Sequence, residues 1–132
     1  MDSKQNWLDR PIHPGLPALT TEVMIFAFII LAAILTRFYD LGSRVMSHDE
    51  SLHTYFSWLL YRGQGYEHSP MMHGPLQFHL IALSYFLFGA SDFTARIPAV
   101  IFNLMSIGMV WYWRRYLGRT GALIAGVLMV IS

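Results

Sequence analysis

The fold is decided by an uninterrupted apolar stretch at residues 23–36, which reads VMIFAFIILAAILT. Counted from Thr20 to Tyr39 it has 20 residues, and an α-helix of that length spans about 30 Å, the thickness of a bilayer's hydrocarbon core. No small-residue cleavage site follows, because the next residues are Arg37-Phe38-Tyr39-Asp40. We therefore predict a retained membrane-anchoring helix and not a signal peptide that is removed.

The composition of the whole chain agrees with a membrane protein. Of its 132 residues, 55% are hydrophobic and 13% are charged, whereas a soluble domain has about 25% charged residues. The net charge of +1 excludes a nucleic-acid-binding surface built on bulk positive charge. The absence of cysteine excludes a disulfide scaffold, a thiolate zinc site and a cysteine nucleophile.

Three further apolar stretches follow the first. Residues 97–113 form the second predicted span, with Pro98 in its first turn, where a missing N–H costs little. Interfacial aromatic residues and arginines close this span: Trp111, Tyr112, Trp113, Arg114, Arg115, Tyr116 and Arg119. Residues 76–90 are shorter and more polar. The last stretch, 121–132, would give about 18 Å of helix, roughly half a bilayer, so we expect an N-terminal part of a longer membrane protein.

The positive-inside rule orients these stretches. The tail, with Lys4 and Arg10, and the arginine-rich segment after residue 113 should both be cytoplasmic, so two crossings must separate them. We expect an all-α integral protein of the plasma (inner) membrane. Its parts are a Pro-containing cytoplasmic tail (1–21), a first transmembrane helix (22–38), an extracytoplasmic loop (39–95) with interfacial or re-entrant helices at about 48–62 and 76–90, a second transmembrane helix (96–113), a cytoplasmic loop (114–120) and an incomplete third helix (121–132).

The start of the helix that we expect at about residues 48–62 has two compatible interpretations. Apolar residues at helical spacing predict a helix that rests on the membrane with its apolar face in lipid: Leu52, Tyr55, Phe56, Leu59 and Leu60. Ser47 and Glu50 have the spacing of a capping box, in which each side chain satisfies a backbone N–H of the other. A carboxylate of Asp49 or Glu50 on this rigid mount can also act as a general base towards an acceptor hydroxyl or amine.

Metal binding is an alternative use of the loop's polar residues, which include His48, Glu50, His53, His68 and His73. Their spacing matches no compact zinc pattern such as His-Glu-x-x-His. We therefore expect no protein-bound metal, and His48 and His53 stay the candidates if a divalent metal is bound.

Two more positions lie where the loop meets the apolar stretches. His73-Gly74-Pro75 reads as a turn that leads into a helix. Arg96 directly precedes Ile97-Pro98. At the membrane interface an arginine can extend towards water or pair with a lipid phosphate.

The order of these motifs resembles a known family. The motifs are Asp49-Glu50, His73-Gly74-Pro75-Leu76, Leu87-Phe88-Gly89, Ala95-Arg96-Ile97-Pro98 and Arg114-Arg115-Tyr116-Leu117-Gly118. Over about residues 23–132, this order is similar to the N-terminal portion of the GT-C glycosyltransferases that use polyprenyl-phosphate sugars. Within that class it most resembles the protein O-mannosyltransferase and lipid A aminoarabinose transferase group, family 39.

The resemblance implies an enzyme that transfers a sugar from a polyprenyl-phosphate carrier to an extracytoplasmic acceptor. Asp49 and Glu50 match the family's acidic pair and are the implied catalytic residues. His73-Gly74-Pro75 matches its Lys-Pro-Pro or His-Pro-Pro motif, with Gly74 replacing the first proline, and His73 and Arg96 are the implied contacts to the donor phosphate. The implied partners are membrane lipid, the donor and the remaining helices of the parent protein. The 132 residues are not expected to catalyse alone.

Two other functions stay open at the level of sequence. One is a non-catalytic transmembrane subunit or assembly scaffold of a larger membrane complex, packing through its aromatic side chains. The other is a small transporter component. Asn103 is the only strongly polar residue within residues 97–113 and no ionisable residue lies mid-span, which disfavours a conduction path.

Overall fold

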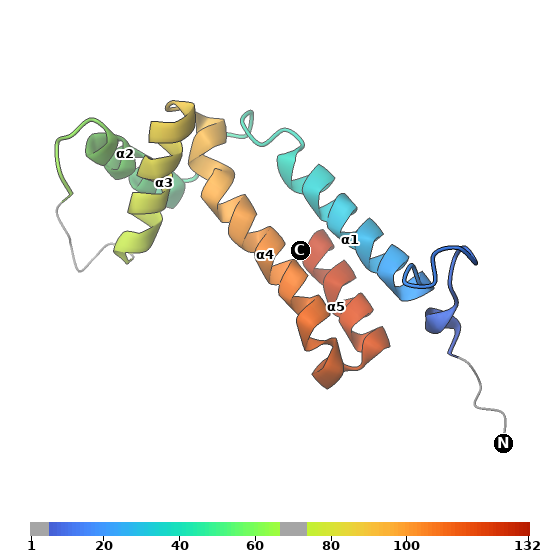
Figure 1. Cartoon of the computed structure of the whole chain (residues 1–132). Coiled ribbons are helices and arrows are strands. Elements are labelled where there is room, and N and C mark those ends of the chain that lie inside the picture. The colour runs from blue at the N-terminus through green and yellow to red at the C-terminus, as the bar shows by residue number, and fades with distance from the viewer. Residues whose placement is uncertain (1–5, 67–73) are drawn as a thin grey trace, which may run out of the picture. The chain divides into compact units, whose positions relative to one another are not determined.

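The computed structural model describes residues 6–66 and 74–132, and its regular elements there are helices (Figure 1). In chain order these are η1 (Trp7–Asp9), α1 (Thr21–Phe38), α2 (His48–Tyr61), α3 (Pro75–Phe88), α4 (Asp92–Leu117) and α5 (Arg119–Ile131). The all-α class is thus confirmed for the described part of the chain. The chain divides into two compact units, residues 1–36 with 104–132, and residues 37–103.

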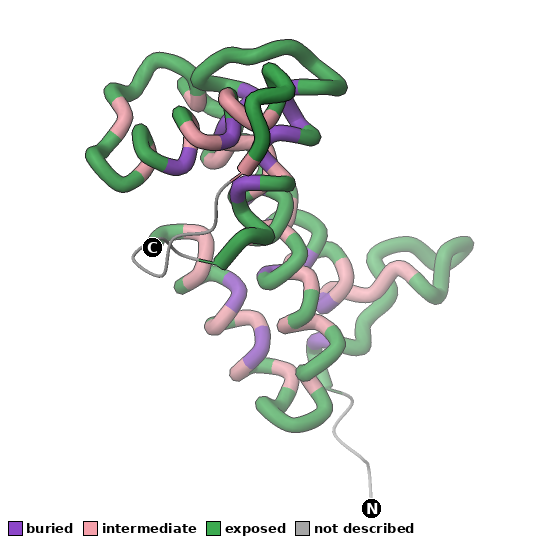
Figure 2. Tube along the Cα trace, turned by 90° about the vertical axis from the view of Figure 1, so that its left-hand side faces the viewer, coloured by how far each residue is buried: buried purple, intermediate pink, exposed green. Residues whose placement is uncertain are grey.

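Two of these helices, α1 and α4, are long and apolar enough to cross a membrane, whereas α3 and α5 are apolar but shorter. Only 17% and 33% of the apolar windows of α1 and α4 are buried, so neither is a core helix of this chain. Figure 2 shows the buried positions as short patches along a mostly exposed trace. Exposed large apolar side chains on long helices suit an apolar surrounding such as lipid.

In the first unit, α1, α5 and the C-terminal half of α4 pack around a small apolar core. Ile29, Ala33 and Ile107 are buried at its centre. Gly126 on α5 allows the close approach of α1, because a Cβ at that position would lie 3.3 Å from Ile29 Cγ2. The core is therefore built from small and branched side chains at helix contacts, as is common between membrane helices.

In the second unit, α2 packs against α3 through polar and aromatic side chains, among them Phe56, whose ring centroid lies 6.4 Å from that of Phe78. His53 and Ser57, one helical turn apart, are both buried, and the His53 ring stacks on Phe78 with centroids 4.8 Å apart. Leu52 and Tyr55, on the predicted apolar face, stay exposed. The side chains that this helix offers to its surroundings are thus largely apolar.

The start of α4 differs from the prediction. Ser91 and Thr94 cap the helix reciprocally: the Ser91 N–H donates to Thr94 Oγ1 (2.9 Å) and the Thr94 N–H donates to Ser91 Oγ (3.1 Å). The helix therefore begins at Asp92, ahead of the apolar run. Pro98 lies inside the helix and not in its first turn, so that prediction was wrong.

The internal proline is compensated by α3. Proline has no N–H, so it cannot bond the carbonyl four residues earlier, which belongs to Thr94. Ser84 Oγ on α3 donates to that carbonyl at 2.7 Å, in a buried position. The bond holds α3 against the first turns of α4. Further along α4, Asn103 Oδ1 accepts a hydrogen bond from Arg37 Nε (3.1 Å), so this polar side chain serves a contact between helices.

Candidate functional site

The N-terminus of α2 carries the predicted capping box. Ser47 Oγ accepts a hydrogen bond from the Glu50 N–H, and Glu50 Oε2 accepts one from the Ser47 N–H, both at 3.3 Å. The capping prediction is confirmed. It fixes the first turn of α2, and with it the backbone that carries Asp49 and Glu50.

The same glutamate is paired with an arginine from α4. Arg96 Nε donates to Glu50 Oε1 at 2.6 Å, and Arg96 Nη2 donates to Glu50 Oε2 at 3.3 Å. The Arg96 side chain is only 10% exposed. Two parallel bonds between a guanidinium and a carboxylate are the strong, geometrically specific form of an ion pair.

Arg96 also fixes the segment between α1 and α2. Its Nη1 donates to the carbonyl of Leu41, and its Nη2 donates to the carbonyl of Arg44 at 2.7 Å. With the two bonds to Glu50, these use four of the five N–H donors of an arginine. Arg96 thus joins three parts of the second unit: residues 41–44, the start of α2 and the start of α4.

The two adjacent carboxylates have different surroundings. The hydrogen bond from Arg96 is the main cause that lowers the pKa of Glu50, so Glu50 stays ionised and is a weak base. Asp49 is exposed, and within residues 6–66 and 74–132 no side chain pairs with its carboxylate. Its carbonyl bonds His53 Nδ1 at 2.7 Å. Of the pair, Asp49 is therefore the carboxylate open to an acceptor.

The histidines give no metal centre among the described residues. No three His, Asp or Glu side chains gather there in a group that could hold an ion. His48 is exposed at the start of α2, while His53 is buried against Phe78. His73, the predicted contact to the donor phosphate, lies outside the described residues, as do Glu67 and His68. Gly74 then forms the N-cap of α3, with Pro75 at its first position.

An apolar groove lies between α3 and the N-terminal half of α4, and sequence reasoning missed it. Its volume is about 490 Å³, and it is lined by Gly74, Leu76, Gln77, Leu80, Ile81, Ala95, Pro98, Ala99 and Phe102. The local sequence pattern does not predict this groove, because the groove depends on how two helices diverge. The groove lies beside α4, one of the two helices long and apolar enough to cross a membrane.

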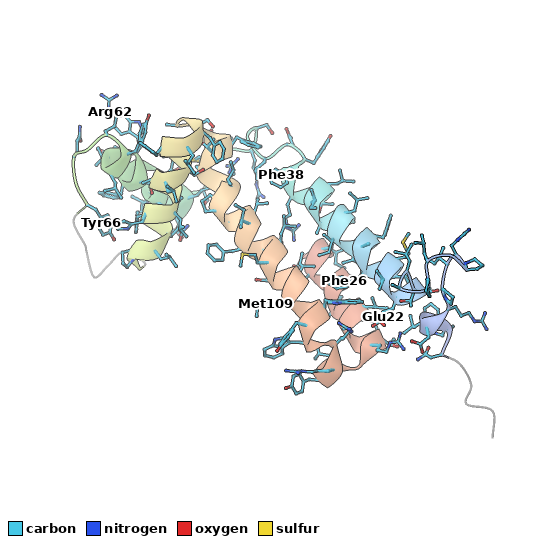
Figure 3. All side chains as sticks on the ribbon, in the orientation of Figure 1. Glu22, Phe26, Phe38, Arg62, Tyr66 and Met109 are labelled. Atoms are coloured by element: carbon cyan, nitrogen blue, oxygen red, sulfur yellow. The ribbon has the colours of Figure 1, made fainter. Side chains whose placement is uncertain are left out.

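The first unit holds a second polar cluster, also missed from the sequence. Glu22, labelled in Figure 3, is buried on α1 and accepts bonds from Arg119 Nε at 2.7 Å and Nη2 at 2.5 Å. Arg119 Nη1 also pairs with Asp9 Oδ1 at 2.8 Å. The N-terminal tail and the turn between α4 and α5 therefore lie at the same end of this unit.

Comparison with known proteins addresses the family. A family model described as dolichyl-phosphate-mannose-protein mannosyltransferase matches residues 72–132. This confirms the resemblance. The match covers α3, α4 and α5, and with them Arg96 and the groove, while Asp49 and Glu50 precede it. No curated protein matches the chain, and no solved structure matches it. The matched part of the chain is thus similar to a family of membrane glycosyltransferases, and the chain has two helices long and apolar enough to cross a membrane.

Proposed function

We propose that this chain forms part of an enzyme that transfers a sugar from a polyprenyl-phosphate carrier to an acceptor outside the cytoplasm. The observation that carries the proposal is the Glu50–Arg96 pair beside Asp49, whose carboxylate has no side-chain partner among the described residues. It links the acidic dipeptide on α2 to the arginine of the family-matched region. A reactive carboxylate is thereby held on a rigid helix start, which is what positioning for catalysis requires.

In this proposal Asp49 is the general base. It takes the proton from the acceptor hydroxyl or amine while the acceptor atom bonds to the anomeric carbon of the sugar, with inversion. The bond between the anomeric carbon and the phosphate oxygen breaks, and polyprenyl phosphate leaves with the electron pair. Glu50 does not exchange protons; its ion pair with Arg96 and its bond to Ser47 keep Asp49 in place.

Charge that develops on the leaving phosphate needs a cationic partner. Four of the five N–H donors of Arg96 bond other described residues, which leaves one N–H on Nη1 without a partner among them, and the family motif suggests His73, outside the described residues, as the second contact. Both are proposed to face the donor phosphate. We expect groups from the parent protein to complete the site, because Glu50 already offsets much of the Arg96 charge.

The test is Asp49→Asn in the full-length protein. Membranes that contain it are supplied with radiolabelled polyprenyl-phosphate mannose, and release of polyprenyl phosphate is measured. Loss of a general base should lower the rate by about 100-fold or more. Asp40→Asn is the matched control, because Asp40 is an exposed aspartate of the same loop with a φ of 58° that asparagine tolerates.

Near-normal turnover of the Asp49→Asn variant would remove Asp49 from the mechanism. Failure of the wild-type protein to consume any polyprenyl-phosphate sugar, with the protein correctly inserted, would overturn the proposed function as a whole.

A further inference from the structure

Residues 6–20, which precede α1, form an ordered loop beside the start of that helix (Figure 1). Asn6 Oδ1 caps the short helix η1, because it accepts a hydrogen bond from the Leu8 N–H at 3.2 Å. Further along the loop, the Ile12 N–H donates to the carbonyl of Leu19 at 3.0 Å. This bond closes the loop, so its two ends lie close together.

The loop is fixed to the first unit at three points. The carbonyl of Arg10 accepts two hydrogen bonds from Thr21, the first residue of α1: one from the N–H at 3.0 Å and one from Oγ1 at 3.1 Å. The side chain of Leu8 is buried, and Asp9 Oδ1 pairs with Arg119 Nη1 at 2.8 Å. The base of the loop is therefore held at the level where α1 begins.

Although it is fixed in this way, the loop exposes large apolar side chains, which are Trp7, Ile12 and Leu16. The last turns of α4 meet the same end of the first unit, since Arg114 Nε lies 3.8 Å from Glu22 Oε1. These turns expose aromatic side chains, which are Tyr112, Trp113 and Tyr116. The Arg115 guanidinium lies over the rings of both tyrosines. Apolar, aromatic and basic groups from two parts of the chain thus gather at one end of the unit.

We propose that this loop and the last turns of α4 form a docking surface for anionic phospholipid, in the leaflet at which α1 begins. The headgroup layer on each side of a bilayer is about 5–7 Å thick, which is about one helical turn. The apolar run of α1 begins at Val23. When α1 crosses a membrane, the base of a loop bonded to Thr21 therefore lies in the headgroup layer, where small water-soluble reagents still reach it.

The charge of the surface favours an anionic lipid. Residues 6–22 and 111–121 contain four arginines and two acids, so they carry a net charge of +2. Both acids already pair with Arg119, whereas Arg10 and Arg115 are exposed. A guanidinium bonds phosphate well, and basic groups near a membrane attract anionic lipids. Tryptophan and tyrosine have an apolar body and a polar tip, which suits the same depth.

Photolabelling of the full-length protein in nanodiscs tests this surface. Phosphatidylglycerol or phosphatidylcholine, each with a diazirine at the headgroup end of one acyl chain, is photolysed with the protein, and the labelled residues are mapped by mass spectrometry. Both lipids should label Leu35, which is exposed near the other end of α1 and serves as the internal control for lipid contact. We expect phosphatidylglycerol to label Trp7 and Leu16 about fivefold more than phosphatidylcholine does, which is the effect of one arginine near an anionic surface.

The double variant Arg10→Gln with Arg115→Gln tests whether charge selects the lipid. In this variant the two lipids should label the loop almost equally. The matched control is Arg44→Gln with Arg62→Gln, which removes two exposed arginines of the second unit and should retain the fivefold preference. An unchanged preference in the first variant, or equal labelling of the loop by both lipids in the wild type, would overturn the proposal.

Absence of label in the loop, with Leu35 labelled, would also overturn the proposal and would show that the loop faces water or a protein. This inference does not rest on the proposed reaction. The experiment contains no sugar donor, so each of these outcomes leaves the proposed glycosyl transfer standing.

Discussion

At the scale of single residues, the carboxylate of Glu50 has two partners, whereas that of its neighbour Asp49 has none in the part of the chain that the structure describes. Its carboxylate caps α2 through Ser47 and pairs with Arg96. Both bonds hold it as an anion, so its contribution is to position the helix start. Amide replacement therefore distinguishes the two carboxylates. Glu50→Gln should lower the stability of the folded protein, whereas Asp49→Asn should leave it nearly unchanged.

Glu50→Gln should destabilise the folded protein by about 1–3 kcal/mol, the usual cost of losing a hydrogen bond to a charged group. The amide keeps the shape of the side chain but leaves the nearly buried Arg96 without a counter-ion. The measurement is the free energy of unfolding of the full-length protein in detergent. The double variant Glu50→Gln with Arg96→Gln should lose less unfolding free energy than the two single variants lose together. Strict additivity would show that the pair contributes nothing.

The same ion pair makes stability depend on acid pH. The pKa of Glu50 is lowered in the folded state, mainly by the hydrogen bond from Arg96. A group with a lowered folded pKa contributes stability above its unfolded pKa, and the contribution is lost as pH falls through the folded pKa. The wild type should therefore lose more stability than Glu50→Gln below the ordinary glutamate range. Parallel melting-temperature curves from pH 6 down to pH 3 would contradict the assignment.

The two contacts of Glu50 also show what the sequence can predict. The capping box joins residues three apart, and local spacing governs helix ends, so Ser47 and Glu50 were predictable from the sequence. The pairing with Arg96 joins residues 46 apart in sequence, and no short-range rule brings them together. The bonds that Arg96 makes to the carbonyls of Leu41 and Arg44 were likewise not predictable, while its contact to phosphate stays a prediction.

At the scale of elements, the α3–α4 hairpin depends on the hydrogen bond from Ser84 to the Thr94 carbonyl. Pro98 leaves the Thr94 carbonyl without its helical partner, and Ser84 Oγ supplies the bond from α3. Ser84→Ala should cost about 1–3 kcal/mol, because it leaves a buried carbonyl unsatisfied. The free energy of unfolding measures the cost.

A second substitution tests the cause of that cost. Pro98→Ala restores a backbone N–H that can bond the Thr94 carbonyl within the helix. In the Pro98→Ala background, Ser84→Ala should therefore be clearly less destabilising than in the wild type. An unchanged cost would mean that Ser84 stabilises the hairpin by packing and not through the orphaned carbonyl.

The start of α4 was predicted too late for an identifiable reason. Hydrophobic periodicity marks where apolar residues begin, at Ile97, but a helix begins at its cap. The signal was Ser91-Asp92-Phe93-Thr94, a hydroxyl pair three residues apart with an acid in the first turn. The existence of the four apolar segments was predictable from hydropathy. The groove was not, because it depends on the angle between two helices.

At the scale of the whole molecule, the charges that orient the chain are also paired. The positive-inside rule used Arg119 as a free cationic anchor, yet it bonds Glu22 and Asp9. The tail and this turn lie at the same end of the first unit, and that they share one side of a membrane stays a prediction. No sequence pattern could predict that Arg119 pairs with Glu22, which lies 97 residues away in sequence.

This arrangement predicts the sidedness of three positions, which single cysteines can report, because these 132 residues contain no cysteine and any cysteine elsewhere in the full-length protein is first replaced by serine. Ile12, Tyr39 and Tyr116 are all exposed, and each is replaced by cysteine in the full-length protein. In right-side-out vesicles, a membrane-impermeant maleimide should label Tyr39→Cys, while Ile12→Cys and Tyr116→Cys react only after the vesicles are opened. The physical reason is that α1 separates Tyr39 from Ile12, and α4 returns the chain to the side where Arg119 meets Asp9. Labelling of Ile12→Cys and Tyr116→Cys from opposite sides would contradict the Asp9–Arg119 contact. Labelling of Tyr39→Cys only from inside would place Asp49 in the cytoplasm and remove it from the proposed reaction.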